Sequence, residues 1–261
     1  MDVFDRVAHL IEELGEFACR EQGTISRSYK DDGSVLTATD TAINEQVTEA
    51  LLQLFPTANI VAEEAPNPFN DNAPLTFILD PIDGTDVYSQ GLPSWCISLG
   101  ILDKNRQVVG AMVNAPRWGL SRDEGLFLRQ DPGKQLLLNG EPFTSRLADE
   151  EVTQIAMASY TPSYVSMNNF KGKIRAYGSN ILHMISPLIH PYIQGSISVP
   201  CFAWDVAGAH ALLASQGMVV AYADGQPFEY TDAMLDQRQP FTAMVYSGTA
   251  TAVKTMATLF I

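Results

Sequence analysis

The segment at residues 75–85 constrains the fold and the chemistry of this chain more than any other. Its apolar run at 75–79 follows a proline and predicts a buried strand. The run ends in Asp80 and Asp83, with a stiff proline between them, and Gly84 then permits a tight turn. Two carboxylates at the end of a buried strand repel each other unless a cation lies between them. Because carboxylates and carbonyls are hard oxygen ligands, the segment predicts a magnesium or manganese site beside a turn able to receive a phosphate.

The composition of the chain limits the classes of molecule that it is expected to bind. The chain has 261 residues, 46% of them hydrophobic, which is enough for a large core, and its net charge is −14. That charge argues against nucleic-acid polymers and membrane surfaces as partners. No apolar run approaches the roughly 18 residues of a membrane span, and no cationic signal region is visible. The cysteines, Cys19, Cys96 and Cys201, lack metal-ligand spacing, so we expect buried free thiols and a cytoplasmic location.

Hydrophobic periodicity predicts helices and strands along the whole chain. A first helix is expected over 2–21 and a second over 41–54, which Thr39 or Asp40 would cap. Further strands are expected at 34–37, 60–62, 95–102, 107–113, within 119–138, and at 154–158, 196–200, 218–222 and 241–246. Further helices are expected at 179–189, 205–216 and 249–258. This order predicts layered α and β elements.

A polar stretch at 140–150 suggests a seam between two halves of the chain. We expect an N-terminal α+β half at 1–145, which carries most of the acids at element boundaries. A C-terminal α/β half at 146–261 would carry Asp205, and the two halves would form one compact catalytic unit.

Acids lie at the boundaries of several expected elements. They are Asp40, Glu63, Glu64, Asp80, Asp83 and Asp205. Each of them alone has an ordinary explanation as a helix cap, a solvated loop charge or a turn residue. All of them together favour a metal site in which a divalent ion lowers the pKa of water.

The hexapeptide Asp80-Pro81-Ile82-Asp83-Gly84-Thr85 resembles a signature of the inositol monophosphatase family, the lithium-sensitive, magnesium-dependent phosphatases. Segments 36–40, 60–64 and 204–209 resemble other elements of that family and come in the same order. The resemblance spans most of the chain. It implies a layered αβαβα sandwich, hydrolysis of a small phosphomonoester, and a homodimer.

The resemblance also implies the metal ligands. Glu63, Asp80 and the backbone carbonyl of Ile82 would bind a first magnesium ion. The carboxylates of Asp80, Asp83 and Asp205 would bind a second, and a third, weaker ion would rest on Glu63. Manganese is an alternative to magnesium at these hard oxygen ligands.

The same resemblance implies catalytic and binding roles for other residues. Asp40 and Thr85 would form a dyad that orients the attacking water. The backbone N–H groups of Gly84 and Thr85 would hold phosphate oxygens, Glu64 would assist from outside the ligand set, and Lys30 would counter the charge of the site. The signature places a proline after the first acid and spaces the two acids three apart, which disfavours a phospho-aspartate intermediate and favours direct attack by water.

The sequence allows more than one leaving group for the phosphomonoester substrate. Ser198 stands where inositol-specific relatives carry a glutamate, seven residues before the aspartate of the second signature. One alternative is a 3′(2′),5′-bisphosphate nucleotidase acting on adenosine 3′,5′-bisphosphate, for which Tyr160, Tyr164 and Arg175 are candidate base-stacking residues. A non-enzyme alternative is a catalytically silent acidic scaffold, which would release no phosphate with magnesium.

Overall fold

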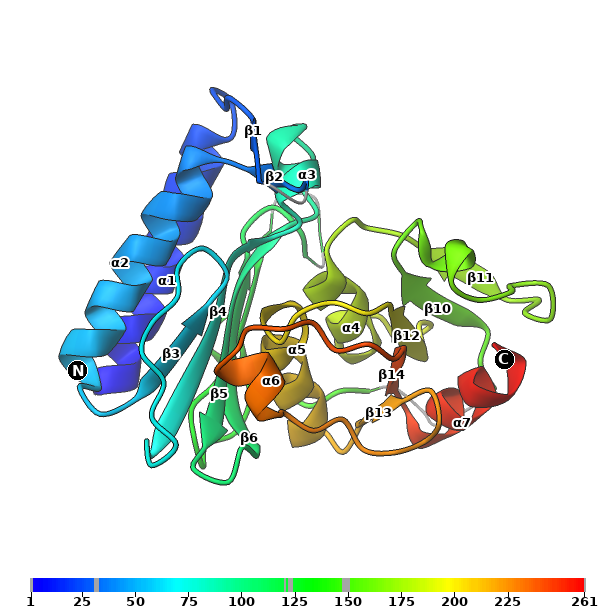
Figure 1. Ribbon diagram of the computed structural model, residues 1–261. Helices are drawn as coiled ribbons and strands as arrows, with labels where there is room; N and C mark the ends of the chain where they lie inside the picture. The colour runs from blue at the N-terminus through cyan, green and yellow to red at the C-terminus, as the bar shows by residue number, and fades with distance from the viewer. Residues whose placement is uncertain (1, 31–32, 120, 122–123, 147–150, 261) are drawn as a thin grey trace.

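The computed structural model describes residues 2–30, 33–119, 121, 124–146 and 151–260. Its layers alternate between helices and sheets (Figure 1). A pair of long N-terminal helices covers one face of the larger sheet, a second helix pair lies between the two sheets, and the C-terminal helix covers the outer face of the smaller sheet. This αβαβα order confirms the fold class expected from the sequence. No described helix is long and apolar enough to cross a membrane.

The outer helices are α1 (Val3–Glu21) and α2 (Ala38–Leu54). The apolar stripe of α1 is buried against α2 and the sheet, as its helical spacing predicts. The expected start of α2 at 41 was wrong, and so was the expected cap. Thr37 is the N-cap, and Asp40 lies in the first turn, where the Asp40 carboxylate accepts from the Thr37 N–H at 3.0 Å. This is a reciprocal capping box, so the helix begins one turn earlier than the apolar pattern indicates.

The larger sheet has the strand order β3-β4-β5-β6-β7-β8-β9. Its strands are β3 (Asn59–Ala62), β4 (Leu75–Asp83), β5 (Cys96–Asp103), β6 (Val108–Ala115), β7 (Leu126–Gln130), β8 (Leu137–Leu138) and β9 (Glu141–Pro142). Strands β3 and β4 are parallel, and the other neighbours are antiparallel. A separate hairpin pairs β1 (Ser28–Tyr29) with β2 (Val35–Leu36). A short helix, α3 (Thr85–Ser89), follows β4.

The middle layer consists of α4 (Asn180–Ile189) and α5 (Trp204–Ser215). Helix α5 packs on β5 and β6, and α4 packs on the smaller sheet. Every residue of α4 from Ile181 to Ile189 is buried, because the helix has a sheet on either side. The hydrophobic core around these helices joins residues of both sheets, such as Val113 and Val245.

The smaller sheet has the order β11-β10-β12-β14-β13 and mixes parallel and antiparallel pairs. Its strands are β10 (Gln154–Met157), β11 (Lys173–Arg175), β12 (Gly195–Ser198), β13 (Val219–Tyr222) and β14 (Val245–Gly248). Outside these strands lie a 3-10 turn, η1 (Thr161–Ser163), the short helix α6 (Asp232–Leu235) and the C-terminal helix α7 (Ala250–Leu259).

The strand expected at 241–246 was misplaced, because β14 begins at Val245. Phe241 is buried in the core, but its N–H donates to the carbonyl of Cys201 in a loop, outside the sheet. Its apolar character therefore reflects burial without strand pairing. The expected seam at 140–150 falls partly on residues 147–150, which lie outside the described residues.

Candidate active site

A β-bulge in β4 brings two acidic side chains to one side of the sheet. Asp80 pairs with Ser98 and Asp83 pairs with Cys96, so β4 has an extra residue relative to β5. Pro81 lies in the bulge, where a residue without an N–H is tolerated. Side chains three positions apart normally point to opposite faces of a strand, and one extra residue reverses that alternation. The bulge thus explains how both acids reach the same cavity.

A third acid comes from the start of α5. Carboxylate oxygens of Asp80, Asp83 and Asp205 lie within 4.8 Å of one another. The N–H of Phe202 donates to Asp205 at 2.7 Å, which turns this carboxylate back over the first turn of the helix. The side-chain amide of Asn180 donates to the Asp205 carbonyl at 2.8 Å. Residues from both halves of the chain therefore fix one cluster of oxygen atoms.

Asp83 is held by the N-terminus of α4. One carboxylate oxygen accepts from the Ser179 hydroxyl and from the N–H of Ile181 at 2.7 Å, and the other accepts from the N–H of Asn180 at 3.2 Å. Ser179 is also the N-cap of α4. Free N–H groups at a helix start favour a carboxylate there. This anchor was not predicted from the sequence; a serine at the start of a predicted helix was the available signal.

Asp80 is the most isolated of the three acids. It is buried, and its Oδ1 has no hydrogen-bond partner among the described residues. Burial raises the pKa of Asp80 well above its usual value, and nearby carboxylates, Glu63 foremost, raise it further. Burial and the neighbouring carboxylates likewise raise the pKa of Asp205. An orphaned oxygen among three converging carboxylates fits a hard divalent cation, which supplies the missing partner and offsets the repulsion.

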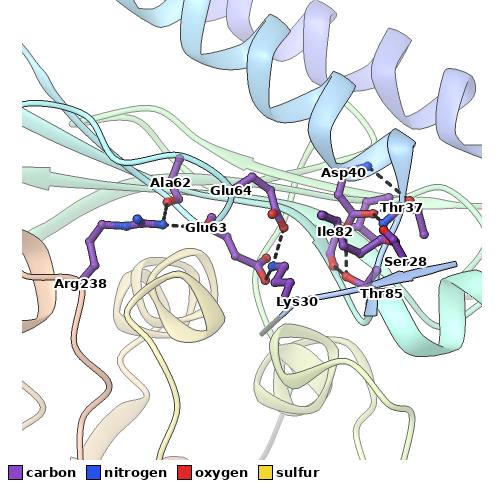
Figure 2. Close-up of polar contacts among 11 residues, drawn as sticks. Ser28, Lys30, Thr37, Asp40, Ala62, Glu63, Glu64, Ile82, Thr85 and Arg238 are labelled. Atoms are coloured by element: carbon purple, nitrogen blue, oxygen red, sulfur yellow. Dashed lines mark hydrogen bonds and ion pairs between the residues drawn. The ribbon is translucent and has the colours of Figure 1, made fainter. Parts of the chain in front are cut away.

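Asp40 and Thr85 form the dyad that the sequence suggested. The Thr85 hydroxyl lies 2.9 Å from Asp40 Oδ1, and the other Asp40 oxygen accepts from the N–H and hydroxyl of Thr37 (Figure 2). Burial raises the pKa of Asp40 to about 6, although the hydrogen bonds from Thr37 and Thr85 oppose that shift. The capping box that starts α2 thus also orients a carboxylate toward Thr85.

Gly84 shapes the turn between β4 and α3. Its φ of 95° is in the left-handed region, which glycine adopts without strain. A Cβ at this position would lie 3.2 Å from the Cβ of Ser179 and 3.3 Å from the carbonyl of Gly178. The backbone of Gly84 therefore packs tightly against the segment that anchors Asp83, and both Gly84 and Thr85 line the cavity.

Lys30 lies between the two glutamates that follow β3. Its Nζ is 2.7 Å from Glu63 Oε1 and 2.8 Å from Glu64 Oε1 (Figure 2). Burial lowers the pKa of Lys30, but the two carboxylates outweigh that effect and raise it overall. Glu63 lines the cavity, and burial followed by repulsion from Glu63 raises the pKa of Glu64. Lys30 therefore offsets negative charge at the edge of the site.

A cavity of about 660 Å³ contains this chemistry. Its walls include Glu63, Asp80, Ile82, Asp83, Gly84, Thr85 and Asp205. The lining also includes the exposed Tyr160 and Arg27 and the buried Val199. The buried Ser198 ends β12 directly before Val199. Of the three residues considered for base stacking, Tyr160 lines the cavity. The ring of Tyr164 lies next to that of Tyr160, with the two centroids 6.5 Å apart.

Comparisons with known proteins show the family of this chain. The model of the inositol monophosphatase family matches residues 6–261. Inositol monophosphatase 2 of Saccharomyces cerevisiae is 27% identical over 236 residues, which are 81% of this chain and 78% of the yeast protein. A fructose-1,6-bisphosphatase/inositol-1-monophosphatase of Thermotoga maritima is 26% identical over 235 residues, 87% of each protein.

A solved structure shows the same fold. An IMPase/NADP phosphatase complexed with Mg²⁺ and phosphate superimposes with a TM-score of 0.80 at 14% identity, over 98% of this chain and 94% of that one. Because the family model covers nearly the whole sequence, the chain belongs to the inositol monophosphatase family of phosphoric monoester hydrolases.

Proposed function

We propose that this chain hydrolyses a small phosphomonoester with magnesium, by direct attack of water. The observation that carries the proposal is the convergence of Asp80, Asp83 and Asp205 within 4.8 Å in a cavity that also contains Thr85. Membership of the inositol monophosphatase family supports the same chemistry.

The donor atoms support two divalent ions. Glu63, Asp80 and the Ile82 carbonyl would hold one, and Asp80, Asp83 and Asp205 would hold the other. Lys30 already occupies one oxygen of Glu63, which favours two ions over a third at that glutamate. When bound, such cations lower the pKa of water and neutralise charge on the phosphoryl group.

The chain's own residues orient the attacking water. Thr85 has one hydroxyl proton, and donating it to Asp40 leaves the oxygen lone pairs free to accept from a water molecule. Asp40 is fixed by Thr37, so the Thr85 hydroxyl is fixed in turn. Glu64 contributes indirectly, because its ion pair with Lys30 stabilises the position of that lysine beside Glu63.

The turn after β4 would bind the phosphate. The N–H groups of Gly84 and Thr85 lie where β4 gives way to α3, on the wall of the cavity. Backbone N–H groups at a glycine turn suit phosphate oxygens, since no side chain blocks their approach. With a net charge of −14, the chain depends on such local donors and on bound cations to accept an anionic substrate.

The leaving group defines a second candidate function. A 3′(2′),5′-bisphosphate nucleotidase acting on adenosine 3′,5′-bisphosphate is favoured by Tyr160, an exposed aromatic ring on the cavity wall that offers a surface for a base. The names of relatives differ in substrate: one carries both fructose-1,6-bisphosphatase and inositol-1-monophosphatase activities in its name. A matched panel of phosphomonoesters separates these classes.

Further properties belong to the same proposal. Residues 1–145 and 146–261 would act as one catalytic unit, which is supported by a core containing residues of both sheets. We expect a homodimer, and inhibition by lithium through competition for the ligands Asp80, Asp83 and Asp205. The free thiols of the described cysteines support a reducing, cytoplasmic environment.

The test is magnesium-dependent phosphate release by the full chain. The panel comprises inositol 1-phosphate, adenosine 3′,5′-bisphosphate, fructose 1,6-bisphosphate, histidinol phosphate and glycerol phosphate. At least one should be hydrolysed with magnesium and none with EDTA, and Asp83→Asn should lower the rate by several orders of magnitude. Glu12→Gln, an exposed change on α1, serves as the control. An acidic scaffold would release no phosphate from any of them.

A further inference from the structure

Arg238 connects a loop of the C-terminal half to the end of β3. Its Nη2 donates to the backbone carbonyls of Ala62 at 2.8 Å and Glu63 at 2.7 Å (Figure 2). One NH₂ group has two protons, so a single nitrogen satisfies both acceptors. The carbonyl oxygens belong to consecutive peptide units on the two sides of the Glu63 Cα.

These contacts fix the backbone of Glu63 from two directions. The Glu63 N–H donates to the Leu79 carbonyl at 3.1 Å, which continues the pairing of β3 with β4, while Arg238 binds the flanking carbonyls. Glu63 lines the cavity. Because the Glu63 backbone is held on both sides, its side chain enters the cavity from a defined position.

Arg238 also packs against Trp204, the residue before Asp205. Its guanidinium carbon lies 5.3 Å from the ring centroid of Trp204. The Trp204 ring stacks on Phe202, with centroids 4.6 Å apart and planes 6° apart, and the Phe202 N–H donates to Asp205. The same side chain thus touches the backbone of Glu63 and, through the Trp204 ring, the aromatic pair beside Asp205.

The backbone of Arg238 is itself in a rarely adopted conformation. Its φ is 51°, in the left-handed region that strains a residue with a side chain. The loop is held in place by the N–H of Gln239, which donates to the Ala233 carbonyl of α6 at 2.7 Å. Two residues of α6, Met234 and Leu235, are buried in the core between the sheets. The surrounding structure therefore maintains the conformation that directs the guanidinium toward β3.

We propose that Arg238 is a positioning residue for the metal site, which sets the spacing between the Glu63 and Asp205 ligands without touching substrate or metal. This inference rests on the proposed function. A planar guanidinium both donates twice from one nitrogen and stacks on an indole ring, whereas a lysine ammonium cannot stack in this way. Lysine at position 238 therefore replaces the arginine only in part. Methionine has no hydrogen-bond donor and does not replace it at all.

The experiment measures magnesium affinity as well as turnover. The full chain is stripped with EDTA and titrated with MgCl₂ by isothermal titration calorimetry, for wild type, Arg238→Met and Arg238→Lys. Residues that orient metal ligands typically change metal affinity by about 10–100-fold when replaced. We expect Arg238→Met to raise the Kd for magnesium at least about tenfold, and Arg238→Lys to give an intermediate value. The kcat at saturating magnesium should change much less than the Kd.

Arg106→Met is the matched control. Arg106 stabilises the same segment by an ion pair with Asp232 and a 3.5 Å hydrogen bond to the Tyr230 carbonyl. Neither Asp232 nor Tyr230 is among the residues that line the cavity. The Arg106→Met variant should have a lower melting temperature than wild type and the same Kd for magnesium. A purely structural role for Arg238 would give the same pattern in both methionine variants.

The outcomes separate this inference from the proposed function. Wild type that binds magnesium and releases phosphate, together with Arg238 variants of unaltered Kd, would overturn the positioning role alone. Wild type that neither binds magnesium nor releases phosphate would overturn both. If Arg238→Met does not fold, Arg238→Lys decides the matter, because a Kd equal to that of wild type contradicts the role.

Discussion

The Thr85 hydroxyl oxygen lies 2.9 Å from Asp40 Oδ1 and 2.9 Å from the carbonyl oxygen of Ile82. A hydroxyl has one proton and therefore donates to one of the two acceptors at a time. The carboxylate is the stronger acceptor when it is ionised. With the proton on the Asp40 side, the Ile82 carbonyl is available to a cation, and the Thr85 oxygen accepts from water. The dyad and the Ile82 carbonyl, which we propose as a metal ligand, are thus coupled through one proton.

Replacing Thr85 tests this coupling. Thr85→Ala removes the hydroxyl, and we expect kcat to fall about 10²–10⁴-fold, the usual range for a positioned proton-transfer group. Thr85→Ser keeps the oxygen and should retain most of the rate. Steady-state kinetics at saturating magnesium would measure both variants. Equal losses in the two would show that the methyl group, and not the hydroxyl, matters.

The stability of the metal-free protein should depend on pH through Asp40. Its pKa in the folded state is about 6, above its ordinary value of 3.8. A carboxyl with a raised folded pKa stabilises the fold fully at low pH, below the unfolded value. That stabilisation is lost as the pH rises through about 6. Relative to Asp40→Asn, wild type should lose roughly 2 kcal/mol in free energy of unfolding between pH 4 and pH 7.

Urea denaturation in EDTA at several pH values measures this difference. The other acids of the site titrate in both proteins, so the comparison with Asp40→Asn isolates one carboxyl. If the free energies of unfolding of the two proteins changed with pH in parallel, burial would not raise the pKa of Asp40.

The caps of two helices offer a matched pair of variants. Ser179 accepts from the Leu182 N–H at 3.1 Å and also donates to Asp83, whereas Thr249 accepts from the Ala252 N–H at 3.1 Å with no link to the acids. Either change to alanine should cost about 1 kcal/mol in free energy of unfolding. Ser179→Ala alone should weaken magnesium binding, measured by calorimetry. The same magnesium Kd in both variants would show that Asp83 does not need Ser179.

Gly84→Ala should impair both folding and turnover. Alanine at a φ of 95° is strained by about 1–2 kcal/mol, and its Cβ would also crowd Ser179 and Gly178. Gly225→Ala is the control, because Gly225 has a φ of 88° with nothing within 4 Å of its would-be Cβ. Urea denaturation should show a larger loss for Gly84→Ala, and kinetics should show lost activity only there. Identical behaviour of both variants would contradict a close-packed phosphate turn.

Local pattern predicted much of this fold. The helical spacing of α1 and the apolar run that begins β4 were sufficient, because both elements bury a continuous surface. The pattern ended β4 at residue 79, whereas the strand reaches Asp83. Polar residues and a proline ordinarily end a strand, and only the pairing with β5 shows that a bulge accommodates them.

The partners of the acids were less predictable than the acids themselves. The signature at residues 80–85 drew attention to Asp80 and Asp83, and the structure brings them together with Asp205. The supports of the site are largely backbone groups, such as the N–H of Ile181 and the carbonyl of Glu63. Every residue has a backbone carbonyl and every residue except proline has an N–H, so these groups leave no mark in the sequence. The contact of Arg238 with Glu63 also spans 175 positions along the chain, beyond any local pattern.

A crystal of the full chain soaked in MnCl₂ tests the central claim most directly. Manganese accepts the same oxygen ligands as magnesium and is located by anomalous scattering. We predict anomalous peaks within about 2.0–2.3 Å of carboxylate oxygens of Asp80, Asp83 and Asp205, with the ions lost in Asp83→Asn. Absence of a peak among these three carboxylates in fully soaked crystals, or their side chains pointing into separate regions, would contradict it.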